Sequence, residues 1–595
     1  MTHLRLVKSV LGQAFRLLPC AAWLPELRNW ATLRGDMVAG ISVAMVMIPQ
    51  AMAYAELAGL PPVFGLYAAS LPPVVAAFFG SSRQLSTGPV AMAALISVAT
   101  VAPLAPPGSD AFITYSITLA LMVGLIRLAL GFLRLGMLVN LLSAPVVAGF
   151  TSAAALIIVT SQLHHLLGVP AALGSRGSGF HFAGVWQVLE SAAERVHEPT
   201  VAMGLLAVVV ILALGRWVPQ APAVLVAVML TTALSWLLAF EGNIVGEVPG
   251  GLPSLQLPAI DGAAVPNLVV GALTITLIGL LEAMSIAKTI ATGTKQRLDI
   301  NQELVGQGLA NVAGSFLQSF VVSGSFSRSA INLASGARTG FSSAVTSLAV
   351  IVTLLFLTPL LFHLPQTTLA AIIATAVLGF LRVEPLRTAW RASRADGVIA
   401  VITFAATLLL APRLHLGVGI GVALSLTAYL YRSMRPRVVY LSRHADGTLR
   451  DADAHGLALD QRIAILRFDG RLYFGDSGYF EEKVLEVVTR LPELRYLVID
   501  AGSINQVDAS GELTLRQVVE RLRGADIDVF FTRAKPQFVD VLERTGAIEA
   551  IGRDHFFAWN QHALEYLWDQ MEPTYRARCP LNVATPHVAA GTWNI

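Results

Sequence analysis

The sequence predicts a polytopic α-helical membrane protein with about fourteen transmembrane segments, followed by a small soluble α/β domain. First, 55% of the 595 residues are hydrophobic and only 13% are charged, whereas soluble domains carry about 25% charged residues. Second, apolar segments recur between Asp36 and Arg432, separated by Gly/Pro clusters and short charged loops. Third, residues 436–595 hold 41 of the 79 charged side chains. We therefore expect a membrane domain with a soluble domain behind it.

These shifts in composition set the expected domain boundaries. Residues 1–35 form a basic N-terminal segment without the pattern of a cleavable signal peptide. A transmembrane domain is expected over residues 36–435, a polar linker over 436–458 and the α/β domain over 459–572. The tail, residues 573–595, is expected to be loosely ordered.

Each predicted membrane segment is an apolar run between Gly, Pro or charged residues. Several are shorter than the roughly 20 residues that a straight helix needs to cross a bilayer. Short segments are tolerated where they line a cavity or pack inside the protein. The expected segments are 36–56, 62–79, 89–103, 112–133, 142–167, 200–215, 220–240, 266–288, 304–321, 326–337, 342–362, 367–382, 397–411 and 415–432.

The distribution of basic residues predicts that both termini are cytoplasmic, in a multi-pass protein of the bacterial inner membrane. Cytoplasmic loops are rich in Lys and Arg. With the N-terminus inside, the outside loops contain only Arg176, Arg195 and Arg413 as basic residues. The basic residues at cytoplasmic ends are Arg83, Arg134, Arg216, Lys295, Arg297, Arg338, Arg382, Arg387, Arg391 and Arg394.

A faint internal repeat predicts two inverted halves of seven segments each. Gln50-Ala51-Met52 in the first segment matches Glu282-Ala283-Met284 in the eighth. Thr87-Gly88 precedes the third segment as Ser323-Gly324 precedes the tenth. Because an odd number of segments separates each pair, the second half is inverted relative to the first.

Two helix starts are candidate anion-binding elements. In SRQLSTGPVAMAAL (82–95), Pro89 suits the first turn of a helix, and in VSGSFSRSAIN (322–332) three serines precede Arg328. A helix that begins inside the membrane exposes unpaired N–H groups, which attract an anion. Taken alone, the first start fits an ordinary capped helix that enters the membrane better than an anion site. Arg328 needs a counter-charge, either a carboxylate such as Glu282 or a bound anion, and we favour the anion.

A buried acid in the eighth segment is a candidate proton carrier. Glu282 lies in the apolar stretch GLLEAMSIAK, and Gln50 and Tyr54 share one face of the first segment. Glu282 could be a static partner of Arg328, or it could bind and release a proton. We favour the second because acids inside a membrane are usually functional.

The soluble domain is predicted to contain alternating strands and helices. Strands are expected at 463–474, 496–500 and 526–532, with amphipathic helices at 478–491 and 510–524. Ser510 fits a helix N-cap better than a phosphorylation site.

Other functional classes lack support in the sequence. Cys20 and Cys579 offer neither a disulfide framework nor a metal site, and no ligand cluster surrounds His164-His165. There is no phosphate-binding loop, HExxH or GxSxG motif in a credible setting, so we expect no enzyme, no metal and no cofactor. A formal net charge of +3 does not suggest nucleic acid as a partner.

From about Leu33 to Ile551 the chain resembles the SulP (sulfate permease) family of anion transporters. The matching stretches are IPQAMAYAELAGLPPVFGLY (48–67), FGSSRQLSTGPVA (79–91), NQELVGQGLANVAGSF (301–316) and SGSFSRSAINLASGARTG (323–340). The resemblance implies fourteen segments divided into core and gate subdomains, and usually a homodimer. It also implies a cytoplasmic STAS domain, whose pattern LVIDAGSINQVDASG (497–511) matches, with Ser510 at the phosphorylated position of the related anti-sigma-factor antagonists.

The resemblance also implies a set of site residues. Glu282 matches the acidic residue of proton-coupled sulfate members. Sodium–bicarbonate members tend to have Asp there and Thr four residues later, where this chain has Ile286. The implied substrate site comprises Gln50, Tyr54, Val90, Ala91, Ser325, Phe326, Ser327 and Arg328.

We therefore expect proton-coupled uptake of a small oxyanion, sulfate first, by elevator-like movement of the core subdomain. Alternatives within the class are a bicarbonate or C4-dicarboxylate carrier, or an anion exchanger. An alternative from another functional class is that the membrane part is a sensor, which signals through a protein partner that binds the STAS domain.

Overall fold

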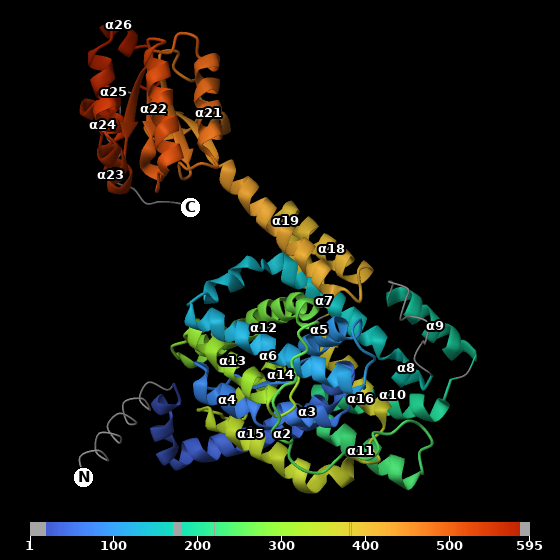
Figure 1. Cartoon of the computed structure of the whole chain (residues 1–595). Coiled ribbons are helices and arrows are strands. Elements are labelled where there is room, and N and C mark those ends of the chain that lie inside the picture. Colours follow the sequence, from blue (N-terminus) through green and yellow to red (C-terminus); the bar gives the residue numbers. More distant parts are fainter. Residues whose placement is uncertain are drawn as a thin grey trace, which may run out of the picture. The chain divides into compact units, whose positions relative to one another are not determined.

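The protein divides into two compact units, Met1–Ser425 and Leu426–Ile595 (Figure 1). The computed structural model describes residues 19–169, 181–194, 196–218, 221–379, 381 and 383–582.

All fourteen segments predicted for the membrane unit coincide with helices, some of them divided into two or three pieces. The helices are α2 (Trp30–Leu57), α3 (Val63–Ser70), α4 (Pro72–Phe79), α5 (Ala91–Val101), α6 (Asp110–Phe132), α7 (Ala144–Ser161), α8 (Leu163–Leu167), α10 (Glu198–Trp217), α11 (Ala223–Leu237), α12 (Val265–Thr294), α13 (Ile300–Ser315), α14 (Phe326–Ala334), α15 (Phe341–Val352), α16 (Gln366–Leu378), α18 (Arg394–Leu409) and α19 (Leu414–Met434). After α15 the chain continues through a π-helical turn, Thr353–Leu357, and a 3-10 turn, Thr358–Leu361.

By length and composition, eight helices among the described residues could cross a membrane. Shorter apolar helices cover Val63–Phe79, Ala91–Val101 and Ala223–Leu237. Two helices that the sequence did not predict, α9 (His181–Glu194) and α17 (Val383–Ala392), occupy connections between segments. Arg176, Arg195 and Arg382, which entered the orientation argument, lie outside the described residues. The orientation and the positions of the termini remain predictions.

Glycines allow α6 and α13 to pack backbone against backbone. A Cβ on Gly124 of α6 would lie 2.8 Å from Val312 N and 2.9 Å from Gly308 O of α13. A Cβ on Gly308 would in turn lie 3.0 Å from Gly124 O. Since a methyl group needs about 3.5 Å or more from a neighbouring heavy atom, only glycine permits this approach. The close packing fixes α13 where its polar side chains reach the candidate site.

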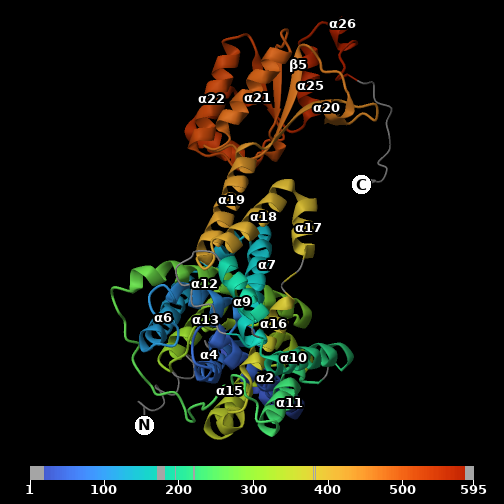
Figure 2. The same ribbon diagram turned by 90° about the vertical axis from the view of Figure 1, so that its right-hand side faces the viewer.

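The second unit contains a mixed six-stranded sheet in the order β4-β3-β5-β6-β7-β8. Figure 2 shows this sheet at β5, with helices beside it. β5 (Ile463–Asp469), β6 (Tyr496–Asp500), β7 (Asp528–Thr532) and β8 (Phe556–Phe557) pair in parallel. One face of the sheet packs against α21 (Ser477–Arg490), α22 (Ala509–Arg523), α23 (Pro536–Thr545) and α24 (Ala547–Ile551). The opposite face packs against α25 (Asn560–Asp569). The three predicted strands and two predicted helices are confirmed, although β5 ends five residues before the predicted strand.

The predicted linker over residues 436–458 is wrong, because this segment belongs to the sheet. β3 (Arg437–Arg443) pairs antiparallel with β5, and β4 (Leu449–Asp451) pairs antiparallel with β3. A short helix, α20 (Ala452–His455), follows. The central residues of β3 are buried although charged residues surround the strand. The hairpin turn contains Gly447 at φ 81°, a conformation that favours glycine.

The expected loose order of the tail is wrong for its described part, residues 573–582. A short helix, α26 (Pro573–Arg576), follows α25, and Cys579 and Leu581 are buried in the same cluster as Leu567 and Trp568. The Tyr575 hydroxyl donates a hydrogen bond to Asp460 (2.7 Å), and Arg443 Nε donates one to Leu581 O (2.9 Å). This part of the tail therefore covers apolar surface of the domain. Residues 583–595 lie outside the described part.

Candidate functional site

The two candidate helix starts meet at a two-stranded antiparallel ladder inside the membrane unit. β1 (Thr87–Gly88) pairs with β2 (Ser323–Gly324), with Thr87 opposite Gly324 and Gly88 opposite Ser323. Ser325 N also donates a hydrogen bond to Ser86 O (2.9 Å). α5 begins shortly after β1 and α14 begins shortly after β2. The ladder therefore brings together two half-helices from distant parts of the sequence.

Neither half-helix has a side-chain cap among the described residues. Val90 is the N-cap of α5 and Ser325 is the N-cap of α14, and neither side chain accepts a bond from its helix. The first backbone bonds are Ala94 N to Val90 O (3.0 Å) and Ser329 N to Ser325 O (3.1 Å). The preceding N–H groups, including that of Ala91, have no partner within their own helix. Such helix ends carry partial positive charge and suit an anion.

Arg328 is fully buried beside the ladder. Its exposed fraction is 0%, and its Nε and Nη2 atoms are buried without a hydrogen-bond partner. A Cβ on Gly88 would lie 3.3 Å from Arg328 Nη2, so the guanidinium lies against β1. In the described part of the chain no ion pair joins Arg328 to Glu282. The static pair considered from the sequence is not formed, and the buried cation is left without a counter-charge from a carboxylate.

Three further predicted residues carry polar groups on α2 and α12: Gln50 and Tyr54 on α2, and Glu282 on α12. Tyr54 of α2 is close enough to Arg328 and to Glu282 for electrostatic interaction with both. Gln50, one turn before Tyr54, is 5% exposed, and its Oε1 is buried without a partner. Glu282 Oε1 is also buried and unpartnered. The unpartnered donors and acceptors give this region the hydrogen-bonding capacity that a polar ligand and a proton need.

The remaining predicted residues differ in exposure. Val90 and Ala91 are buried, and Ser325 is 9% exposed. Phe326 is 61% exposed and Ser327 is exposed, although both are in the first turn of α14. At these two positions the backbone N–H groups, rather than the side chains, belong to the uncapped helix end.

Polar side chains of α13 hold the ladder in place. Asn311 donates from Nδ2 to Val322 O (3.0 Å) and accepts from Val322 N (2.9 Å), so its amide pairs with the backbone before β2. Gln307 donates to Thr87 Oγ1 of β1 (2.7 Å). Both side chains are buried. They lie within the quoted stretch 301–316, but we did not single them out from the sequence.

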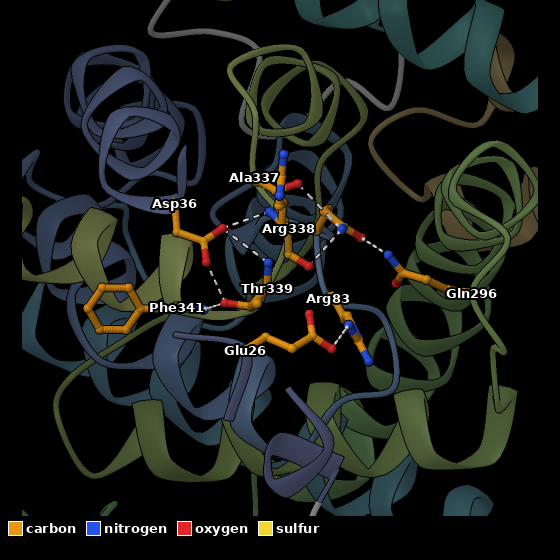
Figure 3. Close-up of polar contacts among 9 residues, drawn as sticks. Glu26, Asp36, Arg83, Gln296, Ala337, Arg338, Thr339 and Phe341 are labelled. Carbon is orange, nitrogen blue, oxygen red and sulfur yellow. Dashed lines mark hydrogen bonds and ion pairs between the residues drawn. The ribbon is translucent and has the colours of Figure 1, made fainter. Parts of the chain in front are cut away.

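A second network of hydrogen bonds surrounds the loop after α14 (Figure 3). Asp36, which is 0% exposed, accepts hydrogen bonds from Arg338 N (2.7 Å), Thr339 N (3.1 Å) and Thr339 Oγ1 (2.5 Å). Gln84 Nε2 donates to Arg338 O (3.2 Å), and Gln84 Oε1 accepts from Gln296 (3.1 Å). The loop after α14 is thus tied to α2 and to the loop before β1.

A second buried arginine, Arg127 of α6, was missed from the sequence. It is 1% exposed, and its Nη1 donates to Val322 O (3.0 Å). The signal was present, because Arg127 lies within an apolar segment that has no acid beside it.

In the second unit the expected N-cap at Ser510 is wrong. Asp508 caps α22 by accepting a hydrogen bond from Gly511 N (2.8 Å), and Ser510 lies exposed in the first turn. The Asp508 carboxylate also accepts from Phe474 N (3.0 Å). Asp508 therefore occupies the N-cap position that we assigned to Ser510.

The fold and the site define a polytopic membrane protein in which two interrupted helices meet at a polar centre, an arrangement typical of secondary transporters. A model of the sulfate permease family matches residues 33–403, and a model of the STAS domain matches residues 457–561. The chain belongs to the sulfate permease family and carries a C-terminal STAS domain.

Named relatives agree with this assignment. The chain is 32% identical to sulfate transporter 4.1 of Arabidopsis thaliana, over 91% of this chain and 81% of that protein. It is also 32% identical to a probable sulfate transporter of Mycobacterium tuberculosis, over 90% and 96% of the two chains.

Solved structures give the same fold. Murine solute carrier 26 family member A9, an anion transporter, matches with a TM-score of 0.83, 24% identity and coverage of 94% and 95%. The transmembrane domain of a cyanobacterial bicarbonate transporter, BicA, matches with a TM-score of 0.57 and 25% identity, over 67% of this chain and 98% of that domain. The predicted seven-plus-seven arrangement is consistent with the fold of the solute carrier 26 protein.

Proposed function

We propose that the protein is a secondary active transporter of a small inorganic oxyanion, sulfate first. The observation that carries this proposal is the fully buried and unpartnered Arg328 beside two uncapped helix ends. A tetrahedral oxyanion there accepts hydrogen bonds from the backbone N–H groups and the guanidinium. The names of the plant and mycobacterial relatives support sulfate as the first substrate to test.

We further propose that Glu282 couples transport to protons. Its buried and unpartnered Oε1 is able to accept a proton, and a protonated Glu282 is neutral beside Arg328 and a bound dianion. Release of that proton on the other side of the membrane would then accompany release of the anion. Transport would follow an inward proton gradient.

The movement that we propose is of the elevator type, in which the core subdomain carries the site across the membrane. The networks around Asn311, Gln307 and Asp36 support this proposal. They tie the ladder to α13 and the loop after α14 to α2, so the two half-helices would move together and keep the anion bound.

Uptake of labelled sulfate into proteoliposomes tests the transport and coupling proposals. With the wild type we expect an inward proton gradient to accelerate uptake, and with Glu282→Gln we expect this acceleration to disappear. Glu247→Gln, at an exposed loop position, is the matched control. Wild-type uptake that does not respond to the gradient refutes proton coupling.

Bicarbonate is the second candidate substrate, favoured by the likeness to the BicA transmembrane domain. Unlabelled bicarbonate, a C4-dicarboxylate and sulfate are compared as competitors of labelled sulfate uptake. Stronger inhibition by bicarbonate than by unlabelled sulfate would reverse the order of the two candidates.

A further inference from the structure

Arg127 is a buried cation that the proposed site does not yet use. Its Nη1 donates to Val322 O, whereas Nε and Nη2 are buried without a partner. The guanidinium keeps its charge at any physiological pH. A buried charge without a counter-charge is costly in protein and more so in a membrane. One backbone carbonyl does not supply that counter-charge.

The guanidinium of Arg127 lies between α12 and β2. A Cβ on Gly279 of α12 would lie 2.4 Å from Arg127 Nη2 and 2.9 Å from Ser323 Oγ, so all three groups meet there. Ser323 Oγ also donates to Gly279 O (3.2 Å). Ser323 is the register partner of Gly88, against which Arg328 lies. The two buried arginines therefore lie against the two members of one pair in the ladder.

The acids on the helices that pack against α6 do not neutralise Arg127. Glu303 of α13 accepts hydrogen bonds from Ser81 N and Ser82 N, both at 2.8 Å, and from Gln307. Glu282 of α12 lies one turn after Gly279. In the described residues neither acid forms an ion pair with Arg127. Of the two described acids on α12 and α13, Glu303 is held by hydrogen bonds, whereas Glu282 Oε1 has no hydrogen-bond partner.

We propose that Arg127 is a second cationic determinant of anion binding, which sets the preference for divalent over monovalent anions. This inference rests on the proposed transport function. With Glu282 ionised, the three side chains carry one net positive charge, which a monovalent anion balances. With Glu282 protonated they carry two, which a divalent anion balances. Arg127 thereby links the charge of the anion to the protonation state of Glu282.

The test uses the scaling of electrostatic energy with anion charge. The attraction between a fixed charge and a bound anion is proportional to the charge of the anion. Replacing Arg127 with Gln removes the charge and keeps an N–H donor. If Arg127→Gln raises the inhibition constant of a monovalent anion about threefold, it should raise that of a divalent anion about ninefold. The two inhibition constants are measured as competition by nitrate and by thiosulfate against labelled sulfate uptake in proteoliposomes.

Two control variants separate charge from structure. Arg127→Lys keeps the charge and should leave the ratio of the two constants unchanged. Arg134→Gln removes an exposed arginine just beyond the end of the same helix and should change neither constant. Each variant is compared at equal abundance and monodispersity in detergent.

The outcomes distinguish this inference from the proposed function. If Arg127→Gln raises the inhibition constants of the two anions by the same factor, Arg127 acts only through the backbone of β2, and the inference is overturned. A changed ratio in Arg127→Lys also overturns it and remains measurable if the Gln variant does not fold. Absence of uptake of any anion by the wild type refutes the proposed function itself.

Discussion

Replacement of Arg328 with Gln should weaken anion binding without disturbing the fold around it. At an effective dielectric constant of about 20, opposite unit charges about 4 Å apart attract by about 4 kcal/mol. Water and the remaining N–H groups recover part of this, and a hydrogen bond to a charged group contributes about 1.5–3 kcal/mol. Since 1.4 kcal/mol corresponds to a factor of about ten, we expect the apparent KM for sulfate to rise between about tenfold and about a hundredfold.

The structure provides a matched control for Arg328→Gln. Arg338 is exposed, and only its backbone takes part in the network at Asp36. Arg338→Gln therefore removes the same charge without touching the ladder. Initial rates of sulfate uptake into proteoliposomes at equal protein density give both constants. A KM for Arg328→Gln within threefold of that of the wild type would refute the placement of the anion beside this guanidinium.

Two predictions concern the STAS unit. Burial raises the pKa of Asp476 to about 6, and the nearby Asp508 adds to this effect. The folded state therefore binds this proton more tightly than the unfolded state does. The stability of the unit should consequently fall as pH rises from about 4 to about 6. Asp476→Asn should abolish this dependence in hydrogen exchange of residues 470–490, and an unchanged pH profile would contradict it. Leu581→Ala should destabilise the unit by about 2–5 kcal/mol, because Leu581 is 1% exposed; a denaturation midpoint equal to that of the wild type would show that the tail is dispensable.

The membrane segments could be predicted from the sequence because lipid leaves the chain few choices. A spanning segment must satisfy its own backbone groups and be apolar over its length, so hydropathy alone locates it. The same logic fails for β3. Arg435, before β3, and Arg437, its first residue, looked like the charged end of the last helix, whereas the burial of β3 depends on β5 and on the tail. Burial that is created by distant segments leaves little trace in local composition.

The candidate site was likewise predicted only in part from the sequence. The helix starts at Pro89 and Ser325 and the buried Arg328 were visible, because Gly, Pro, Ser and Arg are conspicuous inside apolar segments. The pairing of Thr87 with Gly324 involves only two residues per strand, too few to give an alternating pattern. The roles of Asn311 and Gln307 depend on that pairing. A polar residue inside a predicted membrane segment is therefore better assigned to the backbone groups with which it could form hydrogen bonds than to the residues that are near it in the sequence.

The arrangement around the ladder explains how a membrane protein can keep two helix ends uncapped. An uncapped N–H group in an apolar environment costs free energy unless a ligand or water satisfies it. Here the adjoining backbone is satisfied elsewhere: Asn311 pairs with Val322, and Ser329 Oγ accepts from Ser86 N (2.8 Å). Among the described residues, the helix ends and the two guanidinium groups keep donors without a hydrogen-bond partner. Hydrogen bonds thus hold the backbone around the ladder in place. The donors without a hydrogen-bond partner lie where an anion is proposed to bind.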